Sequence, residues 1–222
     1  MLNRYCKGFS LIELMIGFVI GAFVIASSLT AFVAIMRSNA DILKQARLEY
    51  ELSKSLNLMA NDIRRAGYWG NAANDLGTST NTNPFMAAAN RLQVAGNCIL
   101  FSYDLDADGN FPALNTAPSD ERFGYRLTGQ RIQTRPESYS TFACDDADNT
   151  WYDITNQNEI QITNLTFTPV VETVDIDGDG SGTSTIAVTR VDISLTGQLA
   201  DDATINRTYT KSVRVRNDLY TP

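Results

Sequence analysis

Residues 7–17 read KGFSLIELMIG, and they open the longest apolar segment of the chain. From Phe9 to Met36 the only ionisable side chain is that of Glu13, and Arg37 ends the run. As a helix these 28 residues would extend about 42 Å at ~1.5 Å per residue, more than the ~30 Å hydrocarbon core of a bilayer requires. The segment therefore predicts a membrane-spanning helix with one carboxylate near its start.

The flanks of this segment predict its orientation. Arg4 and Lys7 precede it, which favours a cytoplasmic N-terminus and export of everything that follows. An ordinary secretory signal has similar flanks, but its apolar region spans only about 7 to 15 residues and is closed by a small-x-small cleavage site. The stretch from Ala22 to Ala26 offers no clean site of this kind before the apolar run continues.

A carboxylate inside a span usually marks function. Insertion at mid-membrane costs about 2.5–3.5 kcal/mol, and less near the interface. Glu13 is therefore either a functional group or an interfacial residue that reaches the headgroups, and physical chemistry alone leaves both open.

The motif K-G-F-S-L-I-E closely resembles the type III signal of type IV prepilins, in which a short basic leader and a Gly precede an aromatic residue, with Glu at the fifth mature position. The resemblance implies that prepilin peptidase cuts between Gly8 and Phe9 and that the new amine of Phe9 is N-methylated. It also implies that Glu13 pairs with this amine, in the same subunit or in the neighbour being docked, which makes a carboxylate in hydrocarbon tolerable.

An amphipathic segment continues the apolar run. Apolar residues at 4-3-4-3 spacing lie on one helical face, namely Leu52, Leu56, Met59, Ile63 and Ala66. Neither Pro nor Gly interrupts residues 22–66, so a helix is predicted from about Phe9 to Ala66, with Gly67 as its stop. A coiled-coil dimer is the alternative, although two heptads are short for one.

The segment DIRRAGYWG, residues 62–70, resembles the helix end of PilW-type minor pilins, and the similarity continues through CILFSYDLD, RFGYRL and SVRVRND. It implies an α+β pilin-like fold: a leader at 1–8, a membrane-spanning and filament-core helix at 9–36, its amphipathic continuation at 37–67, and an exported β-rich domain at 68–222. We expect Tyr68 and Trp69 to fasten the helix end to the sheet rather than to stack on a ligand.

Alternating apolar residues predict an antiparallel sheet packed on the helix, after a loop that extends to Asn90. The strand candidates are Arg91 to Val94, Cys98 to Tyr103, Arg122 to Leu127, Arg131 to Arg135, Glu159 to Val174, Thr185 to Thr196 and Arg207 to Arg216.

Two of the three cysteines remain if the leader, with Cys6, is removed. In an exported domain Cys98 and Cys144 are expected to form a disulfide, which would stabilise the fold by about 4 kcal/mol in the chain-entropy account. Two buried free thiols, the alternative, fit a cytosolic protein better.

Two acidic runs, DLDADGN from Asp104 and DIDGDGSG from Asp175, both read D-x-D-x-D-G, the opening of a calcium-binding loop. The candidate ligands are Asp104, Asp106, Asp108, Asp175, Asp177 and Asp179. The bidentate Glu expected at position twelve is Asn115 in one run and Ile186 in the other, so closure would need ligands from elsewhere. Calcium is plentiful outside the cytoplasm, and the glycines of the second run favour it slightly. Solvated Asp/Gly turns are the alternative.

Composition argues against catalysis and nucleic-acid binding. The chain has no histidine, which removes the usual general base and most nucleophile pairs and zinc sites, and we expect no enzyme. Without Arg4 and Lys7 there are 16 basic against 25 acidic residues, a net charge of −9, so nucleic acid is a poor partner. The evident basic clusters are Arg64 with Arg65 and Arg214 with Arg216.

The resemblance implies a structural minor pilin that primes assembly of a type IV pilus or caps it, with adhesion, twitching motility and DNA uptake as functions of the whole pilus. Its expected partners are other minor pilins, the major pilin, prepilin peptidase and the inner-membrane assembly platform. We expect a single-pass inner-membrane protein with a periplasmic domain, and later an extracellular pilus subunit. A minor pseudopilin of a type II secretion system and an adhesin or DNA-binding tip subunit remain as alternatives.

Overall fold

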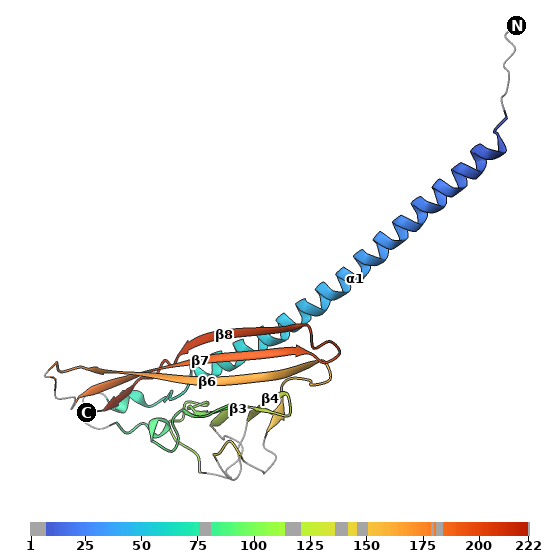
Figure 1. Cartoon of the computed structure of the whole chain (residues 1–222). Helices are drawn as coiled ribbons and strands as arrows, with labels where there is room; N and C mark the ends of the chain where they lie inside the picture. Colours follow the sequence, from blue (N-terminus) through green and yellow to red (C-terminus); the bar gives the residue numbers. More distant parts are fainter. Residues whose placement is uncertain are drawn as a thin grey trace, which may run out of the picture. The chain divides into compact units, whose positions relative to one another are not determined.

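The computed structural model describes residues 8–75, 81–113, 121–135, 142–145, 151–178, 180 and 184–221 (Figure 1). Of the expected leader, Gly8 alone is described, and residues 1–7 lie outside the described part. The chain divides into two compact units, one ending at Ala46 and the other beginning at Arg47.

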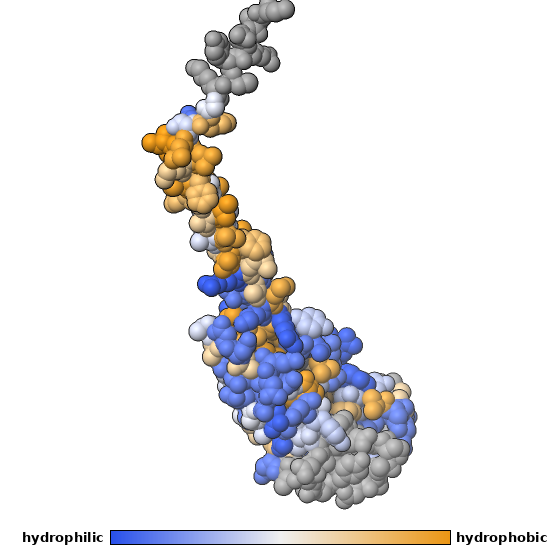
Figure 2. Space-filling model, turned by 90° about the vertical axis from the view of Figure 1, so that its right-hand side faces the viewer, coloured by the Kyte–Doolittle hydropathy of each residue, from blue (hydrophilic) through white to orange (hydrophobic). Residues whose placement is uncertain are grey.

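The first unit consists of the N-terminal part of helix α1, which spans Leu11–Ile63. Its large apolar side chains are exposed, and Figure 2 shows that apolar residues cover most of the face of this helix that is in view. Among the described residues, α1 is the one helix long and apolar enough to cross a membrane. The predicted apolar helix is therefore confirmed, and its side chains need an apolar environment that the isolated chain does not provide.

Three hydroxyl groups within this apolar segment are satisfied by the helix itself. Ser27 and Ser28 donate to the carbonyl oxygen of Val24 at 2.9 and 2.8 Å, and Thr30 donates to that of Ser27 at 2.8 Å. Because the polar atoms bond back to their own backbone, they add little to the cost of burying the helix in hydrocarbon.

The second unit begins on the same helix, where one face becomes buried. The predicted stripe is confirmed, since Leu52, Leu56, Met59, Ile63 and Ala66 are all buried, and Leu48 and Ala60 extend it. The helix ends at Ile63, three residues before the predicted Ala66, because residues 64–67 form a turn. Gly67 closes that turn with φ +74°, and its N–H donates to the carbonyl oxygen of Ser102 at 2.8 Å, so the predicted stop is confirmed.

A first antiparallel sheet follows two short 3-10 helices, η1 (Ala72–Asp75) and η2 (Pro84–Met86). Its strands are consecutive in the sheet, in the order β1 (Gln93–Ala95), β2 (Cys98–Ser102), β3 (Arg122–Thr128), β4 (Arg131–Arg135) and β5 (Tyr152–Asp153). Antiparallel strands that follow one another in this order form a β-meander.

A second antiparallel sheet contains the long strands β6 (Ile160–Asp175), β7 (Thr185–Leu199) and β8 (Asn206–Arg214). The short strand β9 (Leu219–Thr221) pairs with the start of β7. Figure 1 shows β6 to β8 as one layer and β3 with β4 in another. The sequence predicted one sheet without this division, and the α+β class is confirmed.

The buried helix face and both sheets share one core. The helix packs tightly on β7 at Gly197, where an added Cβ would lie only 2.8 Å from Cδ2 of Leu52. A smaller cluster on the first sheet surrounds the predicted disulfide between Cys98 and Cys144, which is formed with a Cα–Cα distance of 6.0 Å. Trp151 belongs to this cluster. The disulfide joins the segment 142–145 to strand β2.

Candidate functional site

The start of α1 carries the residues that the signal motif singled out. Ser10 directly precedes the helix, and its N–H donates to Oε2 of Glu13 at 2.9 Å. This is the carboxylate half of a capping box, in which the third helical residue satisfies an N–H that the helix leaves unpaired. Gly8 and Phe9 lie before the helix and are exposed, Phe9 to 90%. The carboxylate of Glu13 therefore binds the backbone N–H of Ser10, the residue that follows Phe9.

A second candidate site lies in the second unit, where the motif GYWG meets the first acidic run. Trp69 Nε1 donates to the carbonyl oxygen of Gly109 at 2.9 Å, and Gly70 N donates to Oδ2 of Asp104 at 2.8 Å. Asp104 N donates in turn to the carbonyl oxygen of Tyr68 at 2.9 Å. Trp69 thus fastens the helix end to the loop after β2, while the ring of Tyr68 is exposed and only its backbone takes part.

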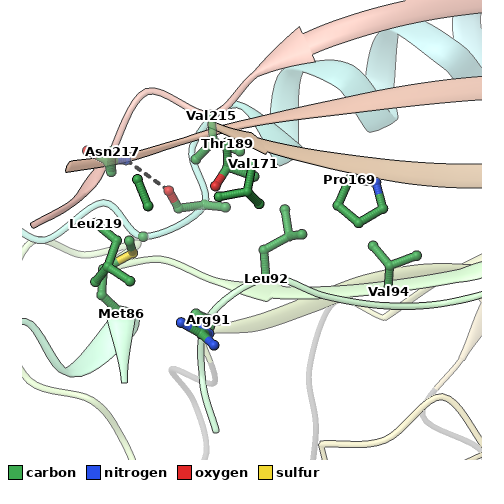
Figure 3. A pocket seen from close by; sticks show the side chains of 13 residues that line it. Met86, Arg91, Leu92, Val94, Pro169, Val171, Thr189, Val215, Asn217 and Leu219 are labelled. Carbon is green, nitrogen blue, oxygen red and sulfur yellow. Dashed lines mark hydrogen bonds between the residues drawn. The ribbon is translucent and has the colours of Figure 1, made fainter. Parts of the chain in front are cut away.

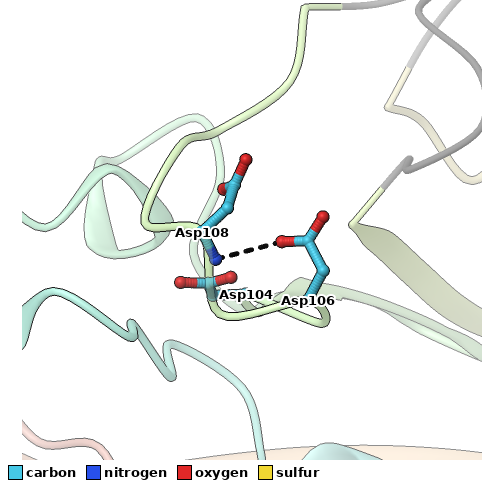
Figure 4. A group of neighbouring side chains, drawn as sticks. All are labelled: Asp104, Asp106 and Asp108. Carbon is cyan, nitrogen blue, oxygen red and sulfur yellow. Dashed lines mark hydrogen bonds between the residues drawn. The ribbon is translucent and has the colours of Figure 1, made fainter.

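The carboxylates of Asp104, Asp106 and Asp108 lie together in this loop (Figure 4). One oxygen of each lies within 4.8 Å of the others. Asp104 is fully buried, whereas Asp106 and Asp108 are exposed. Oδ1 of Asp106 accepts from Asp108 N at 3.1 Å, and the backbone N–H of Asn110, followed by its side chain, lowers the pKa of Asp108.

Glu121, just before β3, joins this cluster although sequence reasoning missed it. It is buried, and its Oε1 accepts a hydrogen bond from Leu105 N. Burial raises the pKa of Glu121 to about 7; the hydrogen bond from Leu105 opposes this rise, and the charges of Asp104 and Asp106 add to it. The one signal in the sequence was that position twelve of the D-x-D-x-D-G run is not Glu, so a further carboxylate would have to come from another part of the chain.

The second acidic run forms the exposed turn after β6. The carboxylate of Asp175 accepts hydrogen bonds from Gly178 N at 3.1 Å and from Gly180 N at 2.9 Å. A hydrogen bond from Asp177 and then these N–H groups lower the pKa of Asp175. Asp179 lies outside the described residues. Calcium binding by this run therefore stays a prediction, and the observed role of Asp175 is to close the turn.

The two basic clusters named from the sequence lie beside each other. Arg216 N donates to the carbonyl oxygen of Arg64 at 3.1 Å. The guanidinium of Arg65 stacks over the ring of Tyr103 at 4.1 Å, and Arg214 forms an ion pair with Asp218 at 3.0 Å. Two of the four arginine side chains, Arg65 and Arg214, therefore contact groups of the same domain. This weakens the case that the cluster binds phosphate.

A cavity of about 300 Å³ lies beside the turn that ends α1 (Figure 3). Arg91 carries the one charge among its lining residues, which otherwise are mainly apolar. The side chain of Asn217 closes one edge by donating to the carbonyl oxygen of Ala66 at 3.0 Å. Among the described lining residues there is one charged group and no pair of side chains suited to general acid–base chemistry.

Comparisons with known proteins agree with the geometry of the N-terminal segment. The prokaryotic N-terminal methylation motif matches residues 3–29, and the family described as prepilin peptidase-dependent protein B matches residues 41–215. An uncharacterised protein of Haemophilus influenzae (strain ATCC 51907 / DSM 11121 / KW20 / Rd) is 26% identical over 168 residues, which cover 59% of this chain and 69% of that protein. No solved structure matches the chain. A prepilin-type motif ahead of one membrane-anchoring apolar helix and a β-rich domain defines a pilin- or pseudopilin-type subunit, and the chain belongs to the prepilin peptidase-dependent protein B family.

Proposed function

We propose that the chain is a minor pilin that primes assembly of a type IV pilus or caps it. The observation that carries the proposal lies in the first unit, where the apolar segment from Phe9 to Met36 is exposed on every side and has its one carboxylate, Glu13, near the start. Such a helix needs hydrocarbon or other apolar helices around it, and a bilayer followed by a filament core supplies both in turn.

Processing is the first step of the proposal. Prepilin peptidase cuts between Gly8 and Phe9, and the amine of Phe9 is then N-methylated. Both residues are exposed and precede the helix, so an enzyme can reach this bond without unwinding the helix. Cleavage creates a positive charge one residue before the N–H that Glu13 already binds.

Assembly is the second step, and Glu13 has a physical role in it. A carboxylate at mid-membrane costs about 2.5–3.5 kcal/mol, and an amine from Phe9 of the same or a neighbouring subunit offsets this cost. The charge pair favours one axial register among helices that are otherwise uniformly apolar. Its partners in this step are the other minor pilins, the major pilin and the inner-membrane assembly platform, and the β-rich domain is periplasmic before assembly and extracellular afterwards.

The variant Glu13→Ala tests this role. Removal of the charge leaves membrane insertion intact or improved, yet incorporation into filaments is expected to fall at least tenfold. Epitope-tagged chain is quantified in sheared filaments and in membranes of cells that express only the variant. Asp41→Ala is the matched control, because Asp41 is an exposed carboxylate of the same helix beyond the apolar segment. Equal incorporation of Glu13→Ala and wild type would contradict the proposal.

Deletion of the chain separates the pilus role from that of a minor pseudopilin, which prepilin peptidase also processes. Loss of surface pili, counted by electron microscopy and restored by a plasmid copy, supports the proposal. Normal piliation together with lost secretion of a hydrolase into the medium assigns the chain to a type II secretion system instead.

A further inference from the structure

Two buried carboxylates at the first acidic run each have an oxygen without a hydrogen-bond partner. Asp104 is 0% and Glu121 1% exposed. Within the described part of the chain, neither Oδ1 of Asp104 nor Oε2 of Glu121 has a hydrogen-bond partner. A buried polar atom left unsatisfied destabilises the fold, and more strongly when it is charged. Two such oxygens beside one acidic turn indicate a missing positive partner.

Glu121 points into the loop rather than away from it. Its Oε1 accepts from Leu105 N, the residue between the first two aspartates of the run, and the charges of Asp104 and Asp106 act on the same carboxyl group. The loop therefore gathers four carboxylates, three from the D-x-D-x-D-G run and one from the start of β3.

The distances suit calcium. Ca²⁺ takes six to eight oxygen ligands at about 2.3–2.6 Å, so two ligands on opposite sides of one ion lie about 4.6–5.2 Å apart. One oxygen each from Asp104, Asp106 and Asp108 lies within 4.8 Å of the others, so the three are spaced closely enough to gather around a single ion. Mg²⁺ demands near-ideal octahedral geometry and keeps several waters, which an irregular set of carboxylates suits less well.

We propose that Asp104, Asp106 and Asp108 bind one calcium ion, beside the buried carboxylate of Glu121. An ion-free Asp/Gly turn explains part of the geometry, since Asp106 accepts from Asp108 N and Asp108 accepts from Asn110 N at 2.7 Å. It does not explain why Asp104 and Glu121 are buried with an oxygen unpaired. The charge of a cation bound by the aspartates would offset this buried negative charge and the repulsion among the neighbouring carboxylates.

The position of the ion indicates what it stabilises. The same loop holds the helix end through Trp69 and Gly109 and through Gly70 and Asp104. Calcium would therefore lock the end of α1 to the first sheet within the second unit. Sites of extracellular modules have dissociation constants of about 10⁻⁴–10⁻³ M, and we expect this site in the same range. Binding itself does not depend on the proposed pilus role.

The test uses the full chain in detergent micelles after removal of metal with a chelator. Terbium, a luminescent substitute for calcium, is titrated with excitation of tryptophan, because Trp69 contacts the loop, and calcium then competes for the site. We expect saturable emission that calcium displaces, and a rise in melting temperature with calcium that magnesium does not match. Trp69→Phe should dim the emission and keep the calcium-dependent rise.

Variants assign the site. Calcium binding should weaken at least tenfold in Asp106→Asn and in Glu121→Gln. Asp106 is exposed, so its variant is expected to fold. Asp177→Asn is the matched control in the other D-x-D-x-D-G run and should bind as wild type does. The absence of saturable emission and of a calcium-dependent melting shift in wild type would overturn the proposal. So would binding that survives in Asp106→Asn and is lost in Asp177→Asn.

Discussion

Replacement of Leu52 by Ala tests how the helix is held on the β-rich domain. Leu52 is fully buried, and its Cδ2 contacts Gly197 of β7, where even an added methyl group would have no room. Loss of three buried carbons costs about 2.4 kcal/mol at ~0.8 kcal/mol each. Incomplete collapse around the cavity brings such substitutions to about 3–5 kcal/mol. Because Leu52 packs on the backbone at Gly197, no side chain there can move to fill the cavity. We therefore expect a loss of about 4 kcal/mol in the free energy of unfolding.

Urea unfolding of the full chain in detergent micelles measures this loss. Trp69 and Trp151 both lie in the second unit, so their fluorescence reports on it. With a slope of about 2 kcal/mol per M, the midpoint should fall by about 2 M. Leu58→Ala is the matched control, because Leu58 is on the same helix but 44% exposed, and it should cost less than about 1 kcal/mol. Equal losses in the two variants would refute docking through the buried stripe.

Three further predictions concern the same domain. Cys98→Ser, with the loop of 46 residues left open, should cost about 4 kcal/mol in urea unfolding, and reductant should produce a similar loss in wild type but none in the variant. Gly67→Ala should cost more than about 1 kcal/mol, because φ is +74° and the new Cβ would lie 2.3 Å from Sδ of Met86; Met86→Ala in the same chain should recover the steric part, and no recovery would contradict the reasoning. Burial raises the pKa of Tyr125, so the folded state keeps this proton after the unfolded chain releases it near pH 10; stability should fall as pH rises above about 10, and less steeply in Tyr125→Phe.

Local patterns in the sequence predicted the helix well. A membrane-spanning segment must satisfy its backbone internally, so an uninterrupted apolar run leaves helix as the natural outcome. The stripe from Leu52 to Ala66 was readable because burial on one face imposes a helical period. Gly67 was readable as the stop because positive φ is cheap only for glycine, and the observed turn needs it.

Features that depend on distant contacts were not readable. Nothing local divides the strands into two sheets, and β5 and β9, of two and three residues, are too short to show alternation. The strand pairing that places Glu121 beside Asp104 joins residues 17 positions apart through β2 and β3. The sequence indicated that a calcium loop would need a ligand from elsewhere, and only the fold shows that Glu121 lies beside this run. The cleavage site and the role of Glu13 remain predictions from the motif.

Mass spectrometry of the mature protein isolated from its own cells tests the central claim most directly, because pilin-type assembly requires that the apolar helix survive processing. The account predicts an N-terminal peptide that begins at Phe9 and carries one methyl group on its amine, with Glu13 and the whole apolar segment retained. A chain that begins beyond Ala22, or one that still carries the leader, would contradict it.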